Sequence, residues 1–273
     1  MIALATQHQK EKVIIPVLGP IFKDEIIVPE NFNSDEFGTF DGRINRTLSA
    51  KETVKMKCLA GMKRLGTTKG IASEGSFGPH PSIPFLPFNE EWIIYIDQEQ
   101  ELEIYGKYVS TETNYWEGEI KDLETLKSTA EKLGFPEHNL ILSVQKPDGR
   151  ELHKDFTTWE SLLRRGEALI SEHSLLLLQT DMRAMHNPTR MKNIGKAAED
   201  LKTNYESQCP SCRKRGYAIT DTKPGLPCSQ CELPSKTTAR VIYTCANCQF
   251  TEELGRPDGI TSIDPQYCDF CNP

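Results

Sequence analysis

The sequence lacks the long apolar segments and the positive charge that mark two large classes of protein. No apolar run approaches the roughly 20 residues that a membrane-spanning helix needs. The apolar start is short, Met1 to Ala5, and no small-residue cleavage site follows it, so it does not predict a signal peptide. The net charge of −7 argues against general binding to nucleic acids or anionic membranes. We therefore expect a cytoplasmic protein with no membrane partner.

Cysteine is almost absent from most of the chain and then becomes frequent. Cys58 stands alone, whereas the other eight of the nine cysteines lie in the last 65 residues. They form four CxxC pairs, which we number as knuckles one to four: Cys209/Cys212, Cys228/Cys231, Cys245/Cys248 and Cys268/Cys271. Two CxxC turns supply the four thiolates of a tetrahedral zinc site. The sequence therefore predicts two structural zinc ions, each closed by four cysteines.

Other uses of these cysteines are disulfides, thiol redox chemistry and iron–sulfur clusters. Four CxxC pairs in a chain without a signal peptide favour zinc over all three. The spacing leaves open which knuckles share a metal ion. Sequential pairing, first with second and third with fourth, is our prediction, and a nested arrangement, second with third and first with fourth, is the alternative.

The first 200 residues alternate between strand-like and helix-like patterns. Apolar runs predict strands at 2–6, 24–30, 69–73, 91–97, 101–111, 139–144 and 174–180. Periodic segments predict helices at 8–22, 49–65, 123–134, 156–170 and 187–205. The short link at 98–100 predicts a hairpin, which argues against a purely parallel sheet. We expect an α/β domain with a mixed sheet flanked by helices at 1–206, and a small zinc-ribbon-like domain at 207–273.

The segment Gly70 to Phe88, GIASEGSFGPHPSIPFLPF, is rich in glycine and proline. Such a composition is unfavourable for a helix and for a central strand. It predicts a rigid loop that follows a strand and carries Glu74 and His80. Because ligand-binding residues concentrate on loops held by a rigid scaffold, we expect a site here; a purely structural loop is the alternative.

Four places in the larger domain carry residues suited to a metal ion and a phosphate. They are the predicted strand-to-helix turn after Ala5, the segment 36–40, the helix before Gly70, and the segment 180–191. Carboxylates suit a hard cation such as Mg²⁺, and lysine and arginine suit an anion. Ordinary surface charges, helix caps and an Asp181–Arg183 ion pair are the alternative explanation. The candidate catalytic residues are Glu36, Glu74, Lys57, Asp181 and Arg183, and the candidate substrate-binding residues are Thr6, His8, Lys10, Lys12, His186, Asn187 and Arg190.

Nearly the full length of the chain resembles a bacterial family of unknown function that carries a cysteine-rich zinc module. The residues that carry the resemblance are GIASEGSFGPHP at 70–81, TDMRAMHNPTRM at 180–191, GLPCSQC at 225–231 and CDFCNP at 268–273. This resemblance implies no established activity.

The N-terminal half resembles the inosine triphosphate pyrophosphatase superfamily more weakly. The matching features are Ala-Thr-Gln-His at 5–8, Glu-Phe-Gly-Thr-Phe at 36–40, Lys57-Cys58, Glu74 at the end of a strand, and Arg183-Ala184. The resemblance implies that Glu36 and Glu74 hold Mg²⁺. It also implies that Lys10 or Lys12, Lys57 and Arg183 hold a triphosphate, which a metal-activated water attacks between the α- and β-phosphates.

Two functions follow from these observations. The first is a Mg²⁺-dependent phosphohydrolase that acts on a nucleotide or a nucleotide-like phosphate. The second is a non-catalytic adaptor, in which the α/β domain binds a small phosphorylated ligand and the zinc module binds a protein or nucleic acid. The tail from 207 onwards balances seven basic against seven acidic residues, so its charge does not favour nucleic acid, although Arg213-Lys214-Arg215 forms a local basic cluster.

Overall fold

The computed structural model describes residues 1–33, 48–81, 83–147, 149–173 and 175–273. The described chain divides into two compact units. The first unit comprises Met1–Tyr95 and Tyr105–Asp200, and the second comprises Ile96–Ile104 and Leu201–Pro273. Each unit is described by itself below.

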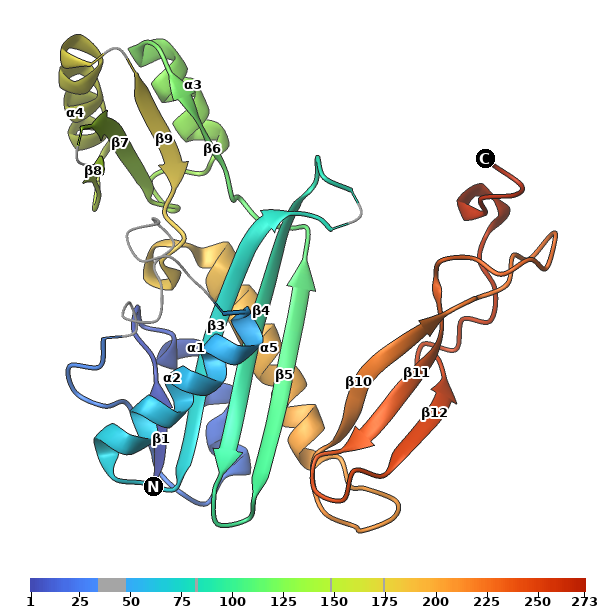
Figure 1. Cartoon of the computed structure of the whole chain (residues 1–273). Helices are drawn as coiled ribbons and strands as arrows, with labels where there is room; N and C mark the ends of the chain where they lie inside the picture. Colours follow the sequence, from blue (N-terminus) through green and yellow to red (C-terminus); the bar gives the residue numbers. More distant parts are fainter. Residues whose placement is uncertain (34–47, 82, 148, 174) are drawn as a thin grey trace. The chain divides into compact units, whose positions relative to one another are not determined.

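A mixed five-stranded sheet organises the first unit (Figure 1). Its strand order is β2-β1-β3-β4-β5, and β1 pairs in parallel with both β2 and β3. The strands are β1 (Ile2–Ala5), β2 (Ile26–Ile27), β3 (Lys69–Pro79), β4 (Pro87–Asp97) and β5 (Leu102–Ser110). Short turns join β3 to β4 and β4 to β5, so these three strands form a meander. The expected mixed sheet is confirmed.

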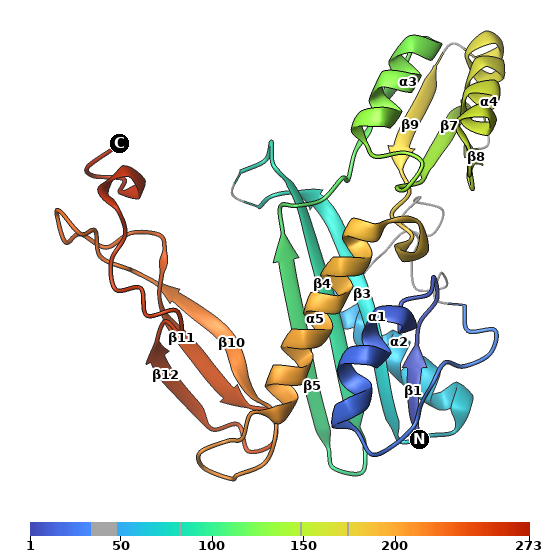
Figure 2. The ribbon, with the colours of Figure 1, turned by 180° about the vertical axis from the view of Figure 1, so that it is seen from behind.

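Helices cover both faces of this sheet (Figures 1 and 2). On one face lies α2 (Ala50–Leu65), and on the other lie α1 (Glu11–Leu18, followed by the turn η1, Gly19–Ile21) and α5 (Pro188–Glu206). The helix predicted at 49–65 is confirmed, and a capping box begins it: the Ser49 side chain accepts from the Glu52 N–H, and the Glu52 side chain accepts from the Ser49 N–H. Gly61 lets α2 approach β1 closely, since a Cβ there would lie 2.5 Å from that of Ala5.

The predicted rigid loop at Gly70 to Phe88 is wrong. Lys69–Pro79 is a single strand, β3, and β4 begins at Pro87, so only the hairpin turn between them lacks strand structure. The His80 N–H donates to the Leu86 carbonyl at 2.8 Å and closes this turn. The prolines lie at the strand ends and in the turn, where strands tolerate them, and the glycines are accommodated within β3.

The remaining strands of the first unit form a second sheet rather than extending the first. This sheet has the order β6-β9-β7-β8, and all its neighbours pair antiparallel. Its core is a separate cluster of buried aliphatic side chains that includes Leu126, Leu142 and Leu178. Its elements are β6 (Glu117–Ile120), α3 (Leu123–Lys132), β7 (Leu140–Lys146), β8 (Gly149–His153), α4 (Trp159–Glu172) and β9 (Leu176–Thr180), and the turn η3 (Ala184–His186) leads from β9 to α5.

The second unit contains a three-stranded antiparallel sheet of order β10-β11-β12. Its strands are β10 (Tyr217–Pro224), β11 (Thr238–Cys245) and β12 (Thr251–Gly255), and a short turn, η4 (Pro265–Tyr267), precedes the last knuckle. Its two apolar clusters are small, and both include cysteines. Such a core is too small to stabilise the unit alone, as expected of a metal-dependent fold. In the described residues, no helix combines the length and apolar character that crossing a bilayer requires.

Candidate functional site

The eight tail cysteines form two groups of four. Knuckles one and three make the first group, and knuckles two and four make the second. Within the groups the closest sulfur atoms are 3.6–3.8 Å apart. A tetrahedral zinc ion with Zn–S bonds of about 2.3 Å requires sulfur separations of about 3.8 Å. The two groups are therefore consistent with two zinc ions, each held by four cysteines.

The predicted sequential pairing of knuckles is wrong, and so is the nested alternative. The observed pairing is interleaved, because the antiparallel sheet sets it. The register pairs Tyr217 at the start of β10 with Cys245 at the end of β11, which places knuckle three beside knuckle one. A separate bridge pairs Cys228 with Ile263 and brings the last knuckle to the second.

The knuckle backbone is shaped to present thiolates. The residue after the second cysteine is left-handed in the first three knuckles, with φ of 63° at Arg213, 61° at Glu232 and 58° at Gln249. Backbone hydrogen bonds from Lys214 to Cys212, and from Cys231 and Gln230 to Cys228, lower the pKa of both thiols to about 7. Backbone donors favour the charged form of a thiol, and the charged form is the one that binds zinc.

A second polar site lies in the first unit, at the carboxyl end of β1. Here the parallel pairing of β1 with β3 ends, and β3 continues beyond it. Five buried ionisable side chains gather here, each at most 7% exposed. They come from four elements and from the turn that follows β1, and they are Lys10, Lys57, Glu74, Glu91 and Arg190. Three cations therefore accompany two carboxylates. The turn after β1 holds two successive left-handed residues, His8 and Gln9, an uncommon conformation for residues other than glycine.

Lys57 and Glu74 form a buried ion pair. The Lys57 Nζ lies 2.5 Å from the Glu74 Oε2, and the two side chains are 6% and 2% exposed. Lys57 projects from α2, and Glu74 lies on β3 just beyond Ala72, the last residue that pairs with β1. The structure thus brings together two of the predicted catalytic residues.

Glu91 and Arg190 form a second buried ion pair, with 2.9 Å between the Arg190 Nε and the Glu91 Oε1. Asn89 donates to the same carboxylate oxygen at 3.1 Å. The other oxygen, Glu91 Oε2, is buried and has no hydrogen-bond partner among the described residues. The pair lies directly against Gly75, where a Cβ would come within 2.6 Å of both side chains.

The pKa values of Lys10 and His8 are lowered by burial and by the neighbouring positive charges. Burial, followed by the charge of Arg190, lowers the pKa of Lys10 to about 7. Its Nζ hydrogen-bonds to the Ser73 side chain at 3.2 Å and to the Ser73 carbonyl at 3.4 Å. Burial also lowers the pKa of His8 to about 4, with contributions from Lys10, Arg190 and Arg183. The positive field that disfavours a histidine cation favours a bound anion.

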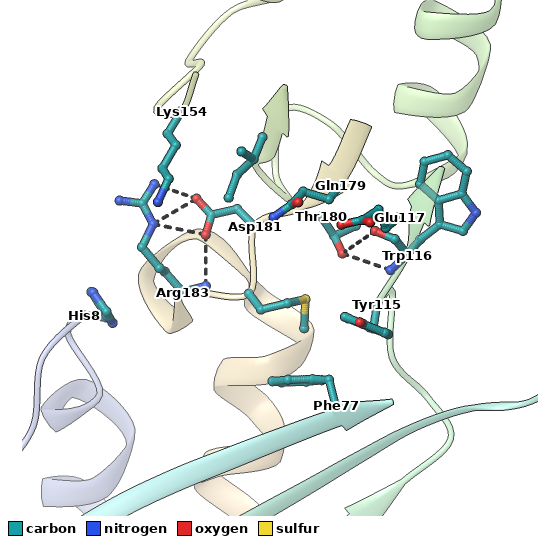
Figure 3. A pocket seen from close by; sticks show the side chains of 12 residues that line it. His8, Phe77, Tyr115, Trp116, Glu117, Lys154, Gln179, Thr180, Asp181 and Arg183 are labelled. Carbon is teal, nitrogen blue, oxygen red and sulfur yellow. Dashed lines mark hydrogen bonds and ion pairs between the residues drawn. The ribbon is translucent and has the colours of Figure 1, made fainter. Parts of the chain in front are cut away.

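A cavity of about 150 Å³ adjoins the cluster at His8 (Figure 3). Its walls combine aromatic and charged side chains. Phe77 and Tyr115 stack with ring centroids 5.9 Å apart, and the Arg190 guanidinium lies 5.1 Å from the Phe77 ring. Among the charged lining residues are Lys154, Asp181 and Arg183. The cavity is smaller than the roughly 300–1,000 Å³ pockets that hold drug-sized ligands, so it suits a small group.

Asp181 and Arg183 form the ion pair that was the alternative explanation for these residues. Asp181 is fully buried, and its carboxylate accepts from the Arg183 backbone N–H at 3.0 Å and from the guanidinium at 2.6–3.1 Å. The same guanidinium contacts Asp155 at 2.6 Å. Figure 3 shows the pair on the wall of the cavity.

The other predicted residues lie in simpler surroundings. Asn187 caps α5, because its side chain accepts from the Arg190 N–H at 3.0 Å, and Pro188 begins the helix as predicted. The Thr6 hydroxyl donates to the Gln7 carbonyl at 3.1 Å. Lys12 is exposed and bonds to Gln9, outside the buried cluster. His186 contacts Asn139 and Asp155, and Glu36 lies outside the described residues.

Sequence reasoning missed Glu91 and Asp155. Glu91 was detectable, because strand alternation places it on the same face of β4 as the buried Ile93. A carboxylate in the buried register of a strand predicts a buried partner. Asp155 lies in a connection between β8 and α4, and no local pattern relates it to Asp181.

Comparison with known protein families identifies a family for this chain. A family model described as a domain of unknown function, DUF6671, matches residues 57–273. No curated protein and no solved structure matches the chain. The matched range contains both cysteine groups and begins at Lys57.

Proposed function

The chain belongs to the DUF6671 family of unknown function. We propose that its first unit is a divalent-cation-dependent phosphohydrolase. Its substrate is a nucleotide or a nucleotide-like phosphate. The second unit is a zinc-ribbon-like module whose two zinc ions are structural, since a site closed by four cysteines leaves no open position for water.

The excess of cations around His8 is the observation that carries this proposal. Lys10, Arg190 and Arg183 all lower the pKa of this cavity-lining histidine after burial itself. A phosphate in the cavity would meet Lys154 and Arg183 on its wall. Two carboxylates, Glu117 and Asp181, also line the cavity, and Asp181 is paired with Arg183. The volume of about 150 Å³ suits the phosphate end of a ligand and leaves the rest of the molecule outside.

The Mg²⁺ ion implied by the pyrophosphatase resemblance does not fit well at Glu74. Mg²⁺ prefers oxygen ligands in octahedral geometry, whereas the Glu74 Oε2 already contacts the Lys57 ammonium at 2.5 Å. Glu36, the other implied ligand, lies outside the described residues. We therefore assign no hydrolytic step to an ion at Glu74.

The same contact favours the second candidate function, a non-catalytic adaptor. A carboxylate neutralised by a buried lysine stabilises the positive cluster without holding a metal. The first unit would then bind the phosphorylated ligand without cleaving it, and the zinc module would bind a protein or nucleic acid.

Release of phosphate and pyrophosphate from a nucleoside triphosphate panel tests the proposal, with Mg²⁺ and Mn²⁺ supplied separately. We expect cation-dependent release by the wild type and at least a tenfold loss in Arg183→Gln and Glu74→Gln. The matched control is Glu253→Gln, which removes a carboxylate that pairs with Lys223 at the same 2.5 Å distance on the surface of the second unit. The control should retain full activity.

Calorimetric titration with a non-hydrolysable triphosphate analogue separates the two candidate functions. Binding without release identifies the adaptor. If the wild type neither binds the analogue nor releases product, both functions are wrong. Far-UV circular dichroism and the thermal unfolding of each variant, compared with the wild type, show whether a loss of activity is a loss of fold in the first unit.

A further inference from the structure

A third group of potential metal ligands lies in the first unit, away from the cysteines. One ligand atom each from Asp155, Asp181 and His186 lies within 4.8 Å of the others. The residues come from the connection after β8, the end of β9 and the turn η3. Three segments that are distant or successive in the chain therefore bring their ligand atoms together.

Asn139 positions two of the three ligands. Its backbone carbonyl accepts from the Asp181 N–H at 2.8 Å, and its backbone N–H donates to the His186 carbonyl at 2.9 Å. Its side-chain amide lies 2.9 Å from the His186 Nδ1. When the amide turns its oxygen toward a protonated Nδ1, this hydrogen bond orients the imidazole and leaves the Nε2 lone pair for a metal.

The other ring nitrogen of His186 faces the group. The Nε2 atom lies 3.3 Å from the Asp155 Oδ1, is buried, and has no hydrogen-bond partner within the described part of the chain. Asp181 is 0% exposed. The group thus combines a fully buried carboxylate, a carboxylate that is 62% exposed and a buried ring nitrogen, a mixed oxygen and nitrogen donor set that suits a metal ion.

Arg183 now supplies the positive charge between the two carboxylates. Its Nη2 lies 2.6 Å from the Asp155 Oδ1 and 2.6 Å from the Asp181 Oδ2. The arginine side chain is 21% exposed and also lines the cavity, so it has space into which it can move. A cation that binds all three ligands would take over its neutralising role.

We propose that Asp155, Asp181 and His186 form a divalent transition-metal site, with Arg183 as the side chain that the metal displaces. The mixed oxygen and nitrogen donors favour an ion such as Mn²⁺ over Mg²⁺, which prefers oxygen alone. Three protein ligands leave coordination positions for water, unlike the closed cysteine groups. The site does not depend on the proposed hydrolytic function.

Electron paramagnetic resonance titration of Mn²⁺ tests the site in the full-length protein with its cysteine groups loaded with zinc. We expect the signal of free Mn²⁺ to fall with a stoichiometry of one per chain. Asp181→Asn and His186→Gln should each weaken binding at least tenfold. The matched control is Asp258→Asn, which removes an aspartate bonded to an arginine two residues away, Arg256, in the second unit; its Mn²⁺ affinity should equal that of the wild type.

Arg183→Gln distinguishes a displaced arginine from a structural one. Because the guanidinium competes with the metal, its loss should tighten Mn²⁺ binding severalfold. Absence of stoichiometric binding by the wild type, or unchanged binding in His186→Gln, overturns the proposal. Since Asp181 is fully buried and its substitution could unfold the sheet, His186→Gln is decisive, with far-UV circular dichroism as the measure of folding.

Discussion

Lys10 places an amine in the protein interior close to two other cations. Among the described residues its Nζ donates hydrogen bonds to Ser73 rather than to a carboxylate. Lys57 and Arg190 lower its pKa, while Glu74 and Glu91 raise it, and burial is the largest influence. The net result is a pKa of about 7 against an ordinary 10.5.

This shift predicts how stability depends on pH. Between about pH 7 and pH 10.5 the lysine is charged in the unfolded chain and neutral in the folded chain. The unfolded chain then holds more protons, so the free energy of unfolding rises with pH in this window, by up to about 1.4 kcal/mol per unit. The burial of Lys10 therefore costs most stability below pH 7.

Lys10→Met should remove this dependence. Guanidinium denaturation at pH 6 and pH 9 should show that the stability of the wild type, relative to the variant, improves by about 3 kcal/mol across the interval. Lys12→Met, at an exposed position two residues further along the chain in α1, should follow the wild type at both pH values. A constant difference between the wild type and Lys10→Met would show that Lys10 stays charged in the folded chain.

Four residues of the polar site could be named from the sequence, but their pairing could not. Lys10 stands in a predicted strand-to-helix turn, Glu74 at the end of a predicted strand, and Lys57 and Arg190 in predicted helices. Their partners depend on contacts between distant segments: Arg190 lies 99 positions from Glu91. Local periodicity carries no information on such distances. Asn187, a predicted substrate-binding residue, caps α5, and its predicted role remains a prediction.

At the scale of elements, β3 contains two glycines whose surroundings differ. Gly75 lies against the Glu91–Arg190 pair, whereas Gly78, three residues further on, has no described atom within 4 Å of the position of a Cβ. The two glycines share a strand and differ in their packing. They form a natural matched pair for substitution.

Gly75→Ala should destabilise the first unit by about 1–3 kcal/mol, because the added methyl forces a buried ion pair to move. Gly78→Ala should change the free energy of unfolding by no more than about 0.5 kcal/mol. Thermal and denaturant unfolding of both variants measures the difference. Equal effects of the two substitutions would mean that the Gly75 site relaxes freely.

The predicted bounds agree best with the observed ones where a capping residue and the apolar periodicity indicate the same helix, as in α2. The second sheet could not be predicted as separate, because its strands carry the same apolar runs as those of the first. The composition of Gly70 to Phe88 predicted a loop, and the prediction was wrong. Pairing of β3 with β1 and β4 overrides the low strand preference of glycine and proline.

At the scale of the whole molecule, interleaving makes the two cysteine groups testable by counting zinc. Replacing knuckles one and three with serine removes one whole group and should leave one zinc ion per chain. Replacing knuckles one and two removes half of each group and should leave none. Native mass spectrometry and elemental analysis give the counts.

Both variants carry four cysteine-to-serine substitutions, so each is the control for the other. Sequential pairing would reverse the two counts, and nested pairing would give no zinc in either variant. Retention of one zinc ion in the first variant alone therefore identifies the interleaved arrangement.

The turn between β4 and β5 has a consequence for how this protein can be divided. Residues Ile96–Ile104 belong to the second unit although the strands on either side belong to the first. Ile104 lies 3.1 Å from where a Cβ of Gly216 would be. A gene fragment that ends before Leu201 would thus retain a piece of the unit it was meant to remove. Expression of the second unit by itself would likewise need the β4–β5 turn as well as the residues from Leu201 onwards.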